Sequence, residues 1–133
     1  KSIMKLKQSI TLAILFLAFI GVQSCKKTEN AAPVVNITEP EIGDTIYSGS
    51  DVHFHGTASD DDALHEGKLQ LLRASDDSLI TQLSVSVHGI KSYTFHEHLT
   101  VQTNVAILAK AKATFSDHDD AITSKEVLIQ LMP

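Results

Sequence analysis

Short runs in which apolar and polar residues alternate dominate the chain after Pro33, and this alternation constrains the fold more than any other feature. In the run "DVHFHGTAS", residues 51–59, the side chains of Val52, Phe54 and Ala58 fall on one side of an extended strand. An amphipathic helix needs apolar residues three and four positions apart, and this spacing is weak along the chain. Because similar runs recur with turn residues between them, the sequence predicts an all-β sandwich.

About seven strands are expected, the number typical of an immunoglobulin-like sandwich. We place them at residues 34–38, 51–59, 68–74, 79–85, 92–99, 105–115 and 125–131. The segment "SDDS" between the third and fourth strands predicts a hairpin turn. The many alanines of residues 105–115 would also suit a helix, but the alternation around them favours a strand. The large side chains expected in the core are Phe54, Phe95, Ile107 and Phe115.

Two segments go beyond a general β pattern. The stretch "PVVNITEPEIGDTIYSGSDVHFHGTASDDD" resembles the opening half of bacterial immunoglobulin-like domains, and "AKATFSDHDDAITSKEVLIQL" resembles their closing half. The whole region is similar to a family of Bacteroidetes lipoproteins with this fold. The resemblance implies a sandwich in which the second and fifth strands are antiparallel neighbours in one sheet. The chain departs from the pattern at Asp120, where such domains usually have glycine.

The start of the chain has the pattern of a secretory signal. Lys5 and Lys7 precede the apolar run "ITLAILFLAFIGV" at residues 10–22, which is short for a membrane span. The "VQSC" that follows resembles the lipobox of bacterial lipoproteins, so we expect Cys25 to be acylated and to begin the mature chain. It is the only cysteine of the sequence, which excludes an internal disulfide.

The expected organisation has three parts: a signal peptide at residues 1–24, lipidated Cys25 with a flexible tether over residues 25–33, and one immunoglobulin-like domain over residues 34–133. A lipid anchor would hold the domain at the bacterial cell envelope, on the outer membrane. The tether lacks the acidic run associated with export to the cell surface, so we expect the domain to face the periplasm.

The charge and the motif content exclude several classes of function. The formal net charge is −5 for the whole chain, and removal of the lysine-containing signal makes the remainder more acidic. Phosphate binding needs clustered lysine and arginine, so nucleic acid is not expected as a partner. The sequence contains no nucleophile elbow, phosphate-binding glycine loop or HExxH motif, and we expect no enzymatic activity.

Two His-x-His pairs occur in the strand-like runs at residues 51–59 and 92–99. Each pair alternates with apolar residues that must face the core, so all four imidazoles should face outward. If these runs are the second and fifth strands, the pairs lie on one face, with cross-strand Cβ atoms about 5 Å apart. Such a patch can supply three or four nitrogens to Zn²⁺ or Cu²⁺. The four residues are His53, His55, His96 and His98.

A plainer interpretation of these histidines is also open. Outward strand positions are polar in any case, and a slip in register would separate the two pairs. On the metal hypothesis, His88 and His118 lie outside the pattern, and we expect their replacement to leave binding intact.

Acidic residues gather in two segments that this fold brings to one end of the sandwich. Oxygen ligands of this kind suit Ca²⁺. However, aspartate is also a common turn residue, and no calcium-loop spacing is present, so the turn interpretation is preferred. The residues are Asp60, Asp61, Asp62, Asp117, Asp119 and Asp120.

Two functions are therefore carried forward from the sequence. The first is a lipid-anchored, non-catalytic binding or adhesion module with a protein or glycan ligand. The second is an envelope protein that binds Zn²⁺ or Cu²⁺ through the four strand histidines. The fold hosts many roles and does not choose between them.

Overall fold

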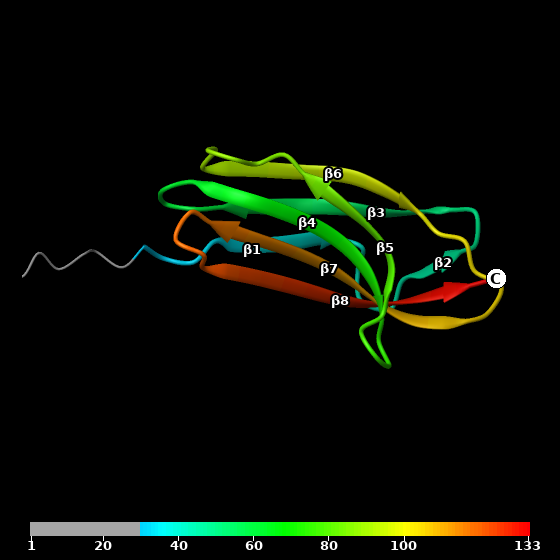
Figure 1. Cartoon of the computed structure of the whole chain (residues 1–133). Helices are drawn as coiled ribbons and strands as arrows, with labels where there is room; N and C mark the ends of the chain where they lie inside the picture. Colours follow the sequence, from blue (N-terminus) through cyan, green and yellow to red (C-terminus); the bar gives the residue numbers. More distant parts are fainter. Residues whose placement is uncertain (1–29) are drawn as a thin grey trace, which may run out of the picture.

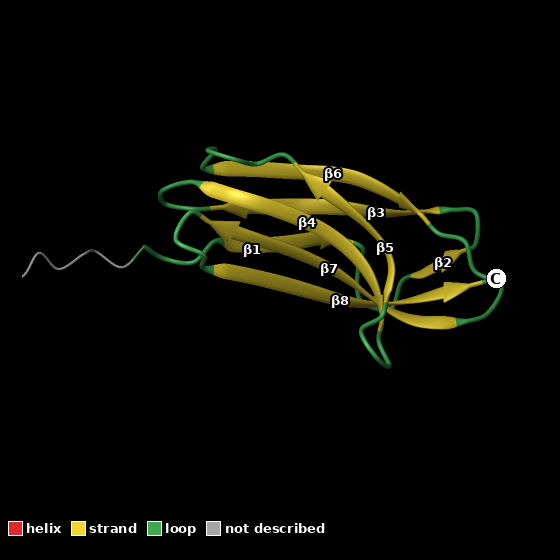
Figure 2. Cartoon of the chain, viewed as in Figure 1, coloured by secondary structure: helices red, strands yellow, loops and turns green. Residues whose placement is uncertain are grey.

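The computed structural model describes residues 30–133, which form two β-sheets packed face to face (Figures 1 and 2). The expected signal peptide and Cys25 lie outside these residues. No helix in the described part is long and apolar enough to cross a membrane. The strands are β1 (Val34–Glu39), β2 (Thr45–Tyr47), β3 (Asp51–Ser59), β4 (Leu64–Arg73), β5 (Leu79–Val85), β6 (Ser92–Thr100), β7 (Ile107–Asp117) and β8 (Ile122–Met132).

The strand order is that of an immunoglobulin-like sandwich, and this confirms the predicted fold class. One sheet has the order β1-β3-β6, and the other has the order β2-β8-β7-β4-β5. The strands β3 and β6 are the predicted second and fifth strands, and they pair antiparallel as expected. The sequence did not predict β2, because a strand of three residues is too short to show an alternating pattern.

The core lies between the sheets and contains the four large side chains that the sequence predicts. Phe54, Phe95 and Phe115 are fully buried, and Ile107 is 8% exposed. The rings of Phe95 and Phe115 are stacked, with centroids 5.8 Å apart. A Cβ atom added at Gly67 would collide with the ring of Phe115, so this strand glycine is required by close packing.

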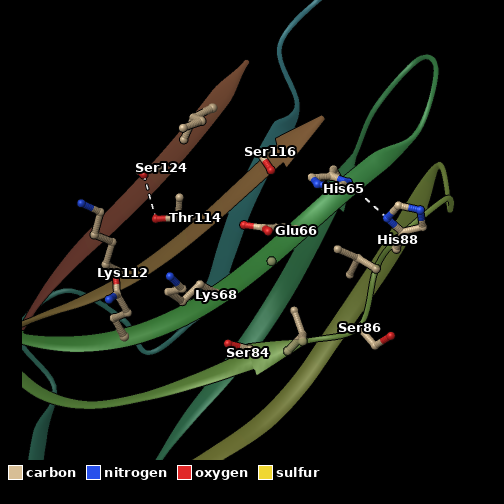
Figure 3. A pocket seen from close by; sticks show the side chains of 15 residues that line it. His65, Glu66, Lys68, Ser84, Ser86, His88, Lys112, Thr114, Ser116 and Ser124 are labelled. Atoms are coloured by element: carbon tan, nitrogen blue, oxygen red, sulfur yellow. Dashed lines mark hydrogen bonds between the residues drawn. The ribbon is translucent and has the colours of Figure 1, made fainter. Parts of the chain in front are cut away.

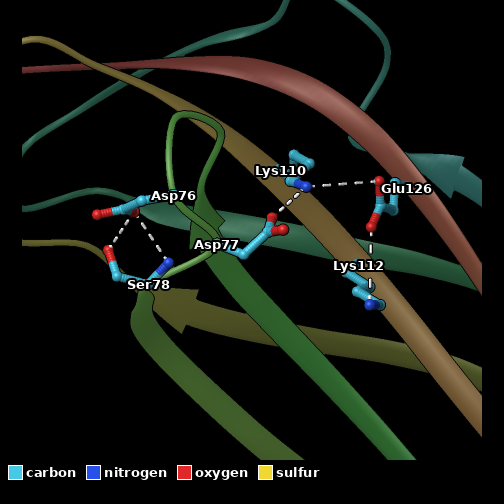
Figure 4. A network of polar contacts seen from close by, with 6 residues as sticks. All are labelled: Asp76, Asp77, Ser78, Lys110, Lys112 and Glu126. Carbon is cyan, nitrogen blue, oxygen red and sulfur yellow. Dashed lines mark hydrogen bonds and ion pairs between the residues drawn. The ribbon is translucent and has the colours of Figure 1, made fainter.

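The turn between β4 and β5 is held by a network of polar contacts (Figure 4). Asp76 Oδ1 accepts hydrogen bonds from the Oγ and the backbone N of Ser78, at 2.7 and 3.0 Å, and these bonds hold the pKa of Asp76 below its ordinary value. Asp77 pairs with Lys110 of β7, and this hydrogen bond raises the pKa of the lysine. The predicted hairpin is confirmed, and its turn is tied to a neighbouring strand.

Candidate metal centre

The two His-x-His pairs face each other across β3 and β6. The register places His53 opposite His98 and His55 opposite His96, which is the arrangement that the metal hypothesis needs. Val52 and Phe54 are completely buried, so the residues that alternate with them point away from the core. The four histidines therefore share the outer face of the three-stranded sheet.

Three of the four histidines bring their ligand nitrogens together. One ring nitrogen from each of His53, His55 and His98 lies within 4.8 Å of the others. The ring centroids of His53 and His98 are 4.3 Å apart. His96 lies close to the same rings, with its centroid 3.7 Å from that of His55, but it does not belong to the group of converging nitrogens. We call His53, His55 and His98 the strand centre.

Two carboxylates lie beside histidines of the strand centre. Glu39 Oε2 lies 3.3 Å from His55 Nδ1, and Asp51 Oδ2 lies 3.8 Å from His98 Nδ1. A carboxylate beside Nδ1 favours a proton on that nitrogen and leaves Nε2 as the lone-pair donor, and histidines that bind metals commonly have such a carboxylate neighbour. In keeping with this, His55 Nε2 is buried and has no hydrogen-bond partner among the described residues.

The sequence did not indicate a role for Glu39, and the reason is an irregularity in strand pairing. The register between β1 and β3 shifts between Ile37 and Glu39, so that Glu39 rather than Thr38 comes opposite His55. A β-bulge of this kind redirects a side chain without leaving a mark in the polar–apolar pattern. The sequence shows that Glu39 is charged and is followed by Pro40, but it does not show that Glu39 lies beside a histidine.

The acidic segments considered as possible cation loops lie at one end of the sandwich, and two of their carboxylates accept hydrogen bonds within their own turns. Asp60 Oδ1 accepts the backbone N–H groups of Asp62 and Ala63, both at 2.9 Å. Asp117 is completely buried, and its Oδ1 accepts N–H groups at 2.8 and 2.9 Å within the β7–β8 turn. Within residues 30–133, none of the six aspartates belongs to a group of three or more converging metal ligands.

Asp120 has a φ of 64°, a left-handed conformation that glycine adopts more readily. This is the position at which the resemblance to bacterial immunoglobulin-like domains led us to expect glycine, and its left-handed conformation is one that glycine would suit. Asp61, Asp62, Asp119 and Asp120 are exposed to solvent.

A second group of histidines was missed by the sequence reasoning. One ring nitrogen from each of His65, His88 and His118 lies within 4.8 Å of the others. These residues come from the start of β4, the β5–β6 loop and the β7–β8 turn. No strand periodicity connects them, so pattern alone gave no signal. All seven histidines of the sequence thus lie on the β3–β6 face or in this second group.

Comparisons with known proteins support the fold and give no function. No protein-family model matches the chain, and no curated protein sequence is similar to it. Among solved structures, the chain is similar to the fibronectin(III)-like modules of CbhA from Clostridium thermocellum, with 15% identity and a TM-score of 0.50 over 74% of this chain and 96% of that one. A CARDB domain from Pyrococcus furiosus, in complex with di-metal ions, aligns with 8% identity and a TM-score of 0.41 over 78% and 96% of the two chains.

Proposed function

We propose that this domain is a non-catalytic module that binds a divalent transition metal, Zn²⁺ or Cu²⁺, through His53, His55 and His98. The observation that carries the proposal is the convergence of three ring nitrogens within 4.8 Å, with a carboxylate beside His55 and a second, more distant one beside His98. The fibronectin(III)-like fold supports a binding domain in general terms. The histidines favour metal binding over the alternative of adhesion to a protein or glycan.

The chemistry of the ligands sets the metal class. Neutral imidazole suits Zn²⁺ and Cu²⁺, whereas Ca²⁺ and Mg²⁺ prefer oxygen ligands. Three protein nitrogens leave one position of a zinc tetrahedron for water or for an external ligand. Because the three histidines come from two paired strands, their backbones are fixed before a metal arrives, which lowers the cost of ordering the site.

The test is a calorimetric titration of the full chain, purified in detergent, with Zn²⁺ and with Cu²⁺. The double variant His53→Gln/His55→Gln should lose the binding event of the strand centre. His96→Gln is the matched control, because this residue lies on the same face but outside the converging nitrogens. Equal heats from the wild type and the double variant would show that these histidines are ordinary surface residues.

The proposal includes an anchor at the bacterial envelope through acylated Cys25, with the domain facing the periplasm. It is supported by the signal pattern at residues 1–24 and by the "VQSC" motif. The described chain begins at Asn30, near the end of the sandwich that holds the β7–β8 turn, where Asn30 Nδ2 lies 3.4 Å from Asp117 Oδ2. Cys25→Ser should move the protein out of the detergent phase in a partitioning assay, and unchanged partitioning would contradict the anchor.

A further inference from the structure

We propose that His65, His88 and His118 form a second site for a divalent transition metal, which we call the end centre. It lies where the β3–β4, β5–β6 and β7–β8 connections meet at one end of the sandwich (Figure 1). Its residues are distinct from those of the strand centre, and so the inference stands without the first proposal.

The backbone holds the three histidines together through buried neighbours. Each histidine directly follows an anchor residue, and these anchors, Leu64, Val87 and Asp117, are at most 1% exposed. Leu64 is paired with Asp117 between β4 and β7. The β5–β6 loop is joined to the same residue, because Leu64 O accepts the N–H of Gly89 at 2.9 Å and Leu64 N donates to Ile90 O at 2.8 Å.

His65 owes its position to a break in the β4–β7 pairing. Leu64 is paired with Asp117 and Glu66 with Ser116, so His65 is an extra residue on β4. Such a bulge redirects the side chain away from the ordinary alternation of the strand. Here it directs the imidazole towards His88, as Figure 3 shows.

The spacing of the rings fits a metal bound by three imidazoles. His65 Nδ1 and His88 Nδ1 are 3.1 Å apart, and the ring of His118 lies 4.7 Å from each of the other two rings, measured between centroids. In a tetrahedral zinc site with Zn–N bonds of about 2.0–2.1 Å, two ligand nitrogens are about 3.3 Å apart. One pair already has nearly this separation, and small ring rotations of two exposed side chains can bring in the third nitrogen.

The surroundings of the end centre favour a cation. The three chain segments that carry these histidines also carry acidic residues. Among the described residues, none of these acidic residues belongs to a group of three or more converging metal ligands. The basic residue Lys91 is also nearby, where its Nζ donates to the carbonyl oxygen of Asp61 at 3.0 Å, but the acidic residues outnumber it. The acidic residues are Asp60, Asp61, Asp62, Glu66, Asp117, Asp119 and Asp120. Their charge raises the local concentration of cations, which is a role distinct from direct coordination.

The end centre opens onto a groove. His65 and His88 line one end of a hollow of about 700 Å³ on the outer side of the five-stranded sheet (Figure 3). Lys68 and Lys112 also line it. Because three histidines fill three positions of a zinc tetrahedron, the fourth remains for water or for a small ligand that enters from the groove.

The experiment measures the zinc stoichiometry of the full chain, purified in detergent, by calorimetric titration. In the variant His53→Gln/His55→Gln/His98→Gln, which lacks the strand centre, one bound Zn²⁺ should persist. Adding His88→Gln and His118→Gln to that variant should abolish it. Both of these residues are exposed, so their replacement should not disturb folding, which circular dichroism without metal would verify.

The variants separate the two centres. The inference is overturned if the variant without the strand centre binds no zinc, or if its bound zinc survives the loss of His88 and His118. If His88→Gln/His118→Gln in the wild-type background removes a zinc while the loss of the strand centre changes nothing, the end centre stands and the proposed function fails. Zinc-induced shifts of the His65, His88 and His118 ring nitrogens in NMR spectra would confirm the assignment independently.

Discussion

Replacing Glu39 by glutamine tests whether the strand centre is built for a metal. The change keeps the size of the side chain and removes its charge, while His53, His55 and His98 stay in place. Glu39 Oε2 lies 3.3 Å from His55 Nδ1, and a metal on the Nε2 side would be roughly 6–7 Å from the carboxylate, given a metal–nitrogen bond of about 2.1 Å. Removal of the Glu39 charge should therefore weaken zinc binding, although all three histidine ligands remain.

The expected size of the effect follows from this separation. A unit negative charge and a divalent cation at that distance attract each other by about 1–2 kcal/mol when solvent screening is strong. Strong screening applies because the Glu39 side chain is 50% exposed. About 1.4 kcal/mol corresponds to a tenfold change in the dissociation constant. Loss of a carboxylate partner to a metal-binding histidine commonly costs about 10–100-fold, so we expect the lower end of that range.

The assay is a zinc titration of Glu39→Gln in the His88→Gln/His118→Gln background, which isolates the strand centre. Asp51→Asn is the matched comparison. Asp51 lies farther from its histidine, at 3.8 Å, and its replacement should weaken binding less. Equal affinity for Glu39→Gln and its parent would refute the carboxylate-backed geometry, and a larger effect from Asp51→Asn would show that the distances do not govern the site.

Three further predictions concern the fold and its turns. Gly67→Ala should destabilise the domain by about 1–3 kcal/mol through overpacking, and Phe115→Leu should relieve part of this cost. If the two substitutions changed the free energy of denaturant unfolding additively, the close contact would be contradicted. Asp120→Gly should stabilise by up to about 1 kcal/mol, seen as a higher urea midpoint with an unchanged slope, because φ is 64° there. Ser78→Ala should raise the pKa of Asp76 in an NMR titration, because the hydrogen bonds from Ser78 favour the charged carboxylate. The stabilising effect of these bonds is lost as the pH falls through the lowered pKa of Asp76. An unchanged pKa in the variant would refute this.

Alternation along the strands was sufficient to predict the fold and the direction of the four strand histidines. Val52, Phe54 and Phe95 had to be buried, and this fixed which side His53, His55 and His98 occupy. The register between β3 and β6 could not be predicted from the sequence. In the structure it is the register that places the two histidine pairs opposite each other. The selection of three nitrogens out of four depends on ring rotations, which no sequence pattern encodes.

The end centre could not be predicted from patterns in the sequence. His65 lies on a bulge, and His88 lies 23 positions away in a loop, so neither belongs to an alternating run that could be projected onto a face. Their meeting depends on which buried residues precede them, namely Leu64 and Val87, and on how those anchors pair in three dimensions. The sequence predicted that His88 and His118 take no part in metal binding. If the end centre binds a metal, neither residue can serve as a silent control in a measurement of total metal, and only variants that remove one centre at a time can assign a bound ion to its site.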